Sequence, residues 1–278
     1  MAPGYWGSPT STLDWCEENY AVTHFIAEFW NTVSNVLMIV PPLITVYLLI
    51  KQQLEQRLVV CHISLLSVGI GSWCFHMTLL YSMQLLDELP MIWGSAFLVY
   101  NVLMVEQPPN KSNVPLQIVL FLYCGVVTVV YMLCNYPVFF QTAYAIMVLS
   151  LVVSCVRLIR NLKKCNKKLF LTGVASYAFG FFLWNVDNGF CGSLQSLRNV
   201  LGPLSPFLEL HAWWHLLAGL GTYLGLVFIA DLRCSVLGQK ARVKYWLKLW
   251  PYLSVDTDSQ KCVGNGTLSK VNGNGVTY

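Results

Sequence analysis

Seven apolar stretches alternate with short polar segments along this chain of 278 residues. Each is close to the roughly 20 residues that a helix needs to cross the hydrocarbon core of a bilayer. The stretches cover residues 26–50, 58–80, 84–105, 114–134, 138–159, 169–190 and 208–231. The pattern predicts an all-α polytopic membrane protein, folded as a bundle of seven transmembrane helices.

The composition agrees with this fold class, because 56% of the residues are hydrophobic and 11% are charged, whereas about 25% charged residues are usual in soluble proteins. We expect three parts: residues 1–25 with an acidic cluster, the helical domain 26–231, and a tail at 232–278. The tail begins basic and turns polar from about Ser254, which predicts disorder. The first residues do not form a signal-peptide pattern, so the first apolar stretch is expected to direct insertion.

The basic residues predict the orientation. Every Lys and Arg except Arg198 falls near the segments after the first, third, fifth and seventh stretches, which lie on one side of the membrane. The positive-inside rule places that side in the cytosol, so we expect a lumenal N-terminus and a cytosolic C-terminus. The net charge of +4 therefore reflects topology, and we expect no nucleic acid partner. The sequence identifies no protein partner.

Sorting the ten cysteines by side brings out a possible disulfide bond. Cys16 and Cys191 lie in lumenal segments under this topology, and Cys134 lies at a lumenal boundary. An oxidising lumen permits a Cys16–Cys191 bond, which would tie the N-terminal segment to the loop after the sixth stretch. The alternative is that both remain free thiols.

Three of the five histidines fall at one predicted depth. His211 and His215 are four residues apart in HAWWH, so they share one helix face, and His76 closes the second apolar stretch. Three imidazoles can hold zinc and leave a fourth position for water, which is typical of a catalytic site. The sequence thus predicts an intramembrane zinc site. In the alternative interpretation each histidine bonds a neighbouring helix carbonyl.

Two further side chains are candidates for catalysis beside such a site. Asp87, where the third stretch enters the membrane, could accept a proton from water and pass it to a leaving group. Ser72 lies one helical turn before His76 and could stabilise a developing oxyanion. The alternatives are a solvated carboxylate at Asp87 and a hydroxyl bonded to its own helix at Ser72. Glu88 is the next carboxylate candidate, but it points to another side of the helix.

The acidic N-terminal segment offers hard oxygen ligands, which suit calcium better than zinc. The candidates are Asp14, Glu17, Asn19, Glu28 and the backbone carbonyl of Trp15. Their spacing does not match an EF-hand loop. Capping of the first helix by acidic residues is the interpretation that the spacing itself favours.

Several segments together resemble the alkaline ceramidases over about residues 5–250. They are DWCEENY, AEFWNTVSN, GSWCFHMTL, QLLDELPM, NVDNGFC and FLELHAWWHLLAGLGTY. The resemblance implies a seven-helix zinc amidase of endoplasmic reticulum and Golgi membranes. It implies zinc at His76, His211 and His215, catalytic roles for Asp87 and Ser72, and the Cys16–Cys191 disulfide. It also implies calcium at Asp14, Trp15, Glu17, Asn19 and Glu28.

The implied substrate is a membrane lipid, ceramide, whose amide is hydrolysed to a sphingoid base and a fatty acid. Unsaturated long-chain ceramide, dihydroceramide and phytoceramide are the expected forms. A competing hypothesis is a seven-helix receptor, similar to the adiponectin receptors, in which zinc is structural. A transporter is disfavoured, because the stretches lack the paired broken helices expected of inverted repeats.

Overall fold

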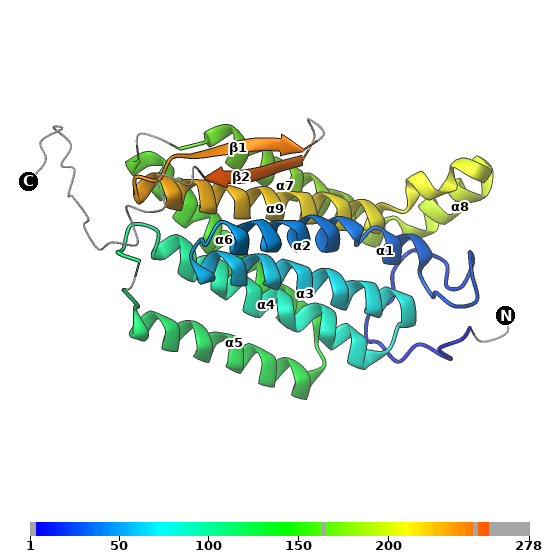
Figure 1. Cartoon of the computed structure of the whole chain (residues 1–278). Helices are drawn as coiled ribbons and strands as arrows, with labels where there is room; N and C mark the ends of the chain where they lie inside the picture. Colours follow the sequence, from blue (N-terminus) through cyan, green and yellow to red (C-terminus); the bar gives the residue numbers. More distant parts are fainter. Residues whose placement is uncertain (1–3, 110, 163–164, 247–249, 256–278) are drawn as a thin grey trace, which may run out of the picture.

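The computed structural model describes residues 4–109, 111–162, 165–246 and 250–255. Long helices run side by side, and a small antiparallel hairpin packs along one of them (Figure 1). The elements are α1 (Phe29–Val33), α2 (Val36–Lys51), α3 (Gln56–Thr78), α4 (Tyr81–Leu103), α5 (Val114–Cys134), α6 (Pro137–Asn161), α7 (Lys167–Gly189), α8 (Cys191–Leu201), the 3₁₀ helix η1 (Gly202–Leu208), α9 (Leu210–Val236), β1 (Ala241–Trp246) and β2 (Trp250–Val255).

Six helical segments of the described chain are long and apolar enough to cross a membrane, which confirms an all-α polytopic membrane protein. They comprise α1 with α2, then α3, α5, α6, α7, and a segment that contains α9. The helix α4 has 23 residues, as many as α3, but Asp87 and Glu88 interrupt its apolar sequence.

The most buried long helix is α9, which packs against α7, α2 and α3. Small residues permit these close approaches. A Cβ atom added at Gly221 of α9 would lie 2.7 Å from the carbonyl oxygen of Gly173 on α7. Met38 of α2 fits between Gly69 and Gly219, where an added Cβ would lie 2.8 Å and 2.6 Å from its side chain. In contrast, α5 lies at the edge of the bundle (Figure 1) and exposes many apolar side chains.

The residues after α9 form structure that the sequence analysis did not predict. The helix continues to Val236, five residues past the predicted limit, and β1 and β2 then pair antiparallel from Ala241 opposite Val255 to Trp246 opposite Trp250. Alternate residues of β2 are buried, and the Tyr223 hydroxyl of α9 donates to the Pro251 carbonyl at 2.8 Å. The first part of the predicted tail is therefore packed on the bundle. Residues 256–278, predicted to be disordered, lie outside the described residues.

The connection from α7 to α9 is also more ordered than the predicted loop. It contains α8 and η1, and a disulfide bond joins Cys191, the first residue of α8, to Cys16 in the N-terminal segment. The N-terminal segment, in turn, pairs with the end of α3 through backbone hydrogen bonds. Ala27 N–H donates to Met77 and Glu28 N–H donates to His76, each at 2.9 Å. These links bring three distant parts of the sequence to one end of the bundle.

Candidate functional site

The three predicted histidines meet where α3 ends and α9 begins, and we call this end of the bundle the histidine end. One ring nitrogen of each residue lies within 4.8 Å of the others. Ring centroids are 4.6 Å apart for His211 and His215, 4.7 Å for His76 and His215, and 5.1 Å for His76 and His211. All three side chains are buried. The prediction that they converge is confirmed, and the group could bind a metal ion.

Hydrogen bonds to the Nδ1 atoms fix the orientation of two of these rings. His76 Nδ1 lies 2.5 Å from the Glu28 carboxylate, and His215 Nδ1 lies 3.0 Å from the Asn31 carbonyl. The Ser34 hydroxyl is 2.9 Å from the same His215 nitrogen. In metal sites, the nitrogen that does not bind the ion commonly donates to a carboxylate or a carbonyl. The arrangement therefore leaves Nε2 of His76 and His215 for an ion.

The third ring is held differently. His211 stacks on Trp15 with ring centroids 4.0 Å apart and an interplanar angle of 29°. Its Nδ1 is buried and finds no hydrogen-bond partner among the described residues. An unsatisfied buried polar atom in a native fold calls for an explanation such as an ion or water. Three imidazoles that each offer one ring nitrogen at this spacing fit a metal of the zinc type.

The predicted pair Ser72 and Asp87 is also brought together. Ser72 lies on α3 one turn before His76, is 2% exposed, and has its hydroxyl beside the Asp87 carboxylate on α4. Asp87 is partly exposed. Gly71 makes this contact possible, because an added Cβ would collide with the Leu86 carbonyl and would lie 2.9 Å from the Asp87 nitrogen. The close approach of α3 and α4 thus places a hydroxyl and a carboxylate together near His76.

Glu88, the second carboxylate candidate on α4, has its own partners. Its Oε2 accepts from the Tyr131 hydroxyl at 2.5 Å and from Gln84 Nε2 at 3.1 Å. Gln84 also accepts from the backbone nitrogen of Thr12 at 2.8 Å. Glu88 therefore joins α4 to α5 and, through Gln84, to the N-terminal segment, which is a packing role.

The acidic N-terminal residues do not gather as the histidines do. Within the described chain, the carboxylates of Asp14, Glu17 and Glu28 are not among the groups with metal-ligand spacing. Glu17 accepts from the backbone N–H groups of Trp30 at 2.7 Å and Asn31 at 2.8 Å, so it caps α1 as the alternative interpretation predicted. Asp14 is exposed.

Glu28 connects this segment to the histidines, because its Oε2 contacts both His76 and Asn31 Nδ2, the latter at 3.0 Å. Its Oε1 and Asn19 Oδ1 are buried without a hydrogen-bond partner in the described chain. Burial raises the pKa of Glu17 to about 7. Among the predicted calcium ligands, these two unpaired oxygens are therefore left for a hard cation, which prefers oxygen ligands.

The disulfide bond between Cys16 and Cys191 is present, with Cα atoms 5.4 Å apart, as predicted. Arg198, about two helical turns further along α8, was not predicted as part of the site. It donates to the Cys16 carbonyl at 2.7 Å, pairs with Glu209 at 2.8 Å, and lies 3.8 Å from Asp187. The signal was in the sequence, because Arg198 was the one cation outside the basic side. The contact of the Asn31 carbonyl with His215 was also not predicted, and nothing in the sequence indicates it.

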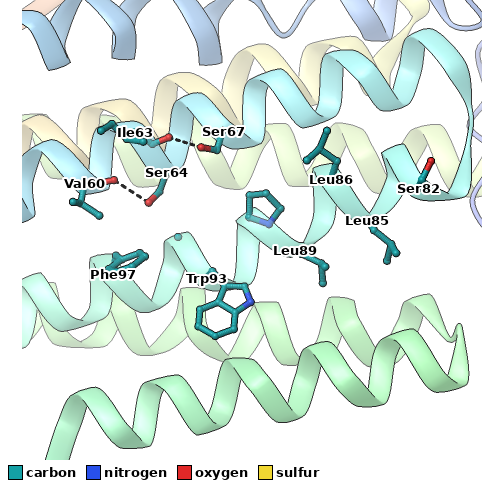
Figure 2. A pocket seen from close by; sticks show the side chains of 12 residues that line it. Val60, Ile63, Ser64, Ser67, Ser82, Leu85, Leu86, Leu89, Trp93 and Phe97 are labelled. Carbon is teal, nitrogen blue, oxygen red and sulfur yellow. Dashed lines mark hydrogen bonds between the residues drawn. The ribbon is translucent and has the colours of Figure 1, made fainter. Parts of the chain in front are cut away.

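A groove of about 620 Å³ lies between α3 and α4 (Figure 2), and none of the three histidines lines it. Figure 2 shows Trp93, Leu89 and Phe97 along it. The Ser64 and Ser67 hydroxyls in its wall donate to carbonyls of their own helix at 2.9 Å. Because these hydroxyls are already used and no histidine or carboxylate lines the groove, it is not a candidate active site.

The fold and the site define a polytopic helical membrane protein with a buried three-histidine centre. The ceramidase family model matches residues 7–254. The chain is 44% identical to alkaline ceramidase 3 of Mus musculus, over 90% of this chain and 96% of the mouse protein. It is 33% identical to alkaline ceramidase YPC1 of Saccharomyces cerevisiae (90% and 86% covered) and 31% identical to alkaline ceramidase of Arabidopsis thaliana (92% and 98%). The chain belongs to the alkaline ceramidase family.

Proposed function

We propose that this protein is an intramembrane amidase that hydrolyses the amide bond of ceramide to a sphingoid base and a fatty acid. The observation that carries the proposal is the buried three-histidine centre close to the Ser72–Asp87 pair, in a chain whose relatives are named alkaline ceramidases. In this account α4 also crosses the membrane, so that seven helices span it and the histidine centre lies within the bilayer.

Zinc is the metal that the donor set favours, since neutral imidazole suits zinc and hard cations prefer oxygen. His76, His211 and His215 would hold it. When bound, such an ion supplies Lewis acidity toward the amide carbonyl and lowers the pKa of water to about 7. The carboxylate of Glu28 and the carbonyl of Asn31 keep two of the imidazoles in the required tautomer.

The chain's own side chains provide the proton transfers. Asp87 accepts a proton from the water that attacks the amide carbon, and it then delivers that proton to the departing nitrogen as the C–N bond breaks. Ser72 donates its hydroxyl hydrogen bond to the carbonyl oxygen as negative charge develops there. Because Ser72 and Asp87 lie beside each other, both groups can reach the same substrate amide.

Ceramide enters this site laterally from the bilayer, with its two chains among the helices and its amide at the histidine end. Unsaturated long-chain ceramide, dihydroceramide and phytoceramide are the proposed substrates. The proposed location is the endoplasmic reticulum and Golgi membrane, with the N-terminus lumenal and the C-terminus cytosolic.

A structural or regulatory calcium ion is proposed for the N-terminal segment. Asp14, Glu17, Asn19, Glu28 and the carbonyl of Trp15 are the proposed ligands. The unpaired oxygens of Glu28 and Asn19 support the site, whereas the capping bonds of Glu17 occupy one lone pair on each of its oxygens. Because a ligand that binds the folded state stabilises it, calcium should raise the melting temperature of the protein.

Release of a fatty acid and a sphingoid base from ceramide by the purified full-length protein tests the proposal. Mass spectrometry measures the amounts of both products formed by the wild type and by the His76→Ala variant. Equal amounts of the two products from the wild type alone are expected. A pure, metal-loaded, folded protein that leaves ceramide intact would favour the receptor hypothesis instead.

A further inference from the structure

The connection between α7 and α9 exposes apolar side chains that no other described part of the chain covers. Helix α8 has no buried residue. Val200 is 81% exposed, more than any other exposed large hydrophobic residue in the described chain. We call the exposed apolar residues of this connection the α8 apolar face: Phe190, Leu197, Val200, Leu204 and Phe207.

The side chains of α8 divide into three faces. Leu197 and Val200 are three residues apart and lie on the exposed apolar face. Gln195 and Asn199, four residues apart, are exposed polar residues on a second face, and the exposed Ser196, one turn before Val200, borders the apolar face. Arg198 is partly buried and points into the protein. The helix is therefore amphipathic, with its polar and apolar faces both free.

The charge of this connection restricts what can bind it. Arg198 is the single charged residue between 190 and 208. Its guanidinium already donates to the carbonyls of Cys16 and Leu208 and pairs with Glu209. The surface consequently offers apolar contacts and no unpaired charge, so its occupant is apolar.

The position of the connection identifies that occupant. It joins the ends of α7 and of α9, both of which belong to membrane-spanning segments, so it lies where these helices leave the bilayer. Phe181 and Phe182 near the end of α7 are more than half exposed, and Phe190 continues this apolar surface toward α8. We propose that α8 and η1 lie in the membrane interface, with the α8 apolar face inserted into the lipid leaflet at the histidine end.

This anchor is independent of the proposed ceramide hydrolysis, but it is linked mechanically to the site. Arg198 connects α8 to the Cys16 carbonyl, next to Trp15, and to Glu209, two residues before His211. Insertion of α8 therefore restrains the start of α9 relative to the membrane surface. Because the anchor has no free charge, it should bind zwitterionic and anionic lipids equally well.

A photo-crosslinking amino acid in the full-length protein tests the anchor. p-Benzoylphenylalanine replaces either Val200 or, as the matched control, the neighbouring Asn199, and the protein is placed in phosphatidylcholine nanodiscs. Mass spectrometry should find several-fold more lipid adducts from position 200 than from 199, with no increase when phosphatidylserine is added. Equal lipid adducts at both positions, adducts to a second copy of the chain, or no adducts at 200 would each overturn the proposal.

Hydrogen exchange provides a second measurement that does not depend on the crosslinker. Val200→Asp should increase backbone exchange of α8 several-fold in nanodiscs, because a carboxylate opposes insertion. Asn199→Asp on the polar face should leave the exchange unchanged. Equal exchange of α8 in Val200→Asp and in the wild type would contradict insertion.

Discussion

Glu28 and Asn31 orient two of the three histidines without being ligands of the proposed zinc site. One offers a carboxylate to His76 Nδ1 and the other a backbone carbonyl to His215 Nδ1. Each contact selects the tautomer whose Nε2 is free, and it also holds the ring in place. The geometry of the site therefore depends on the start of α1 as much as on the helices that carry the histidines.

Replacing Glu28 by Gln should weaken zinc binding at the three histidines. The neutral amide cannot match the charge-assisted bond to His76 Nδ1, and loss of such a partner typically costs about 10–100-fold in metal affinity. Competition with a chelator, followed by elemental analysis, measures the change. Glu18→Gln, at an exposed position in the same segment, is the control. Unchanged metal retention in Glu28→Gln would mean that His76 does not depend on this carboxylate.

Asp87→Asn should lose turnover while keeping the metal and the fold. An amide cannot accept and deliver the proton, and general acid–base catalysis contributes about 10²–10⁴-fold. The comparison is with Glu88→Gln, which should lose thermal stability through its contacts to Tyr131 and Gln84 but retain turnover. Ceramide turnover and melting temperature measure both variants. Normal turnover in Asp87→Asn would remove this residue from the mechanism.

The contact between α3 and α4 is the element-level feature on which the Ser72–Asp87 pair depends. Gly71 lets the α3 backbone approach the carbonyl of Leu86, and the two proposed catalytic groups follow directly in each helix. Periodicity predicted both helices, but it could not predict their separation, because that depends on the side chain that is absent at Gly71.

Gly71→Ala should therefore lower both melting temperature and turnover, because the added methyl group separates α3 from α4. Gly125→Ala is the matched control, since nothing lies within 4 Å of the added Cβ on α5. Alanine is favoured over glycine inside a helix by roughly 0.5–1 kcal/mol, so the control should be neutral or slightly stabilised. If both variants behave alike in thermal unfolding, the close approach at Gly71 is not important.

The long helices could be predicted from the sequence, because about twenty consecutive apolar residues indicate a membrane-spanning helix. It missed α8 and the β1–β2 hairpin for different reasons. Helix α8 has only eleven residues, which is too short for an apolar span. The alternation at Trp250–Val255 covers six residues, and it becomes informative only once the packing against Tyr223 and Gln52 is known.

At the scale of the whole molecule, long-range links assemble the histidine end. The disulfide bond spans 175 residues between Cys16 and Cys191, and the pairing of Glu28 with His76 joins the N-terminal segment to α3. The positive-inside rule had placed these segments on one side, which is why the disulfide could be predicted. Their exact contacts could not, because backbone carbonyls such as that of Asn31 carry no sequence signature.

Cys16→Ser should lower the melting temperature of the full-length protein. A disulfide bond typically contributes about 2–4 kcal/mol to the free energy of unfolding, mainly by restricting the unfolded chain. Cys134→Ser provides the control, because that cysteine is free and exposed. Thermal unfolding in nanodiscs without reductant measures the difference. Equal melting temperatures for Cys16→Ser and the wild type would show that the bond contributes no stability.

The central claim is that the three buried histidines form a catalytic zinc centre. Elemental analysis combined with ceramide turnover, on the same purified samples of wild type and of His76→Ala, His211→Ala and His215→Ala, tests it most directly. The account predicts about one zinc per wild-type chain, since the three imidazoles form one tetrahedral site, and loss of zinc together with turnover in each variant. Full zinc occupancy in any variant, or normal turnover without zinc, would contradict it.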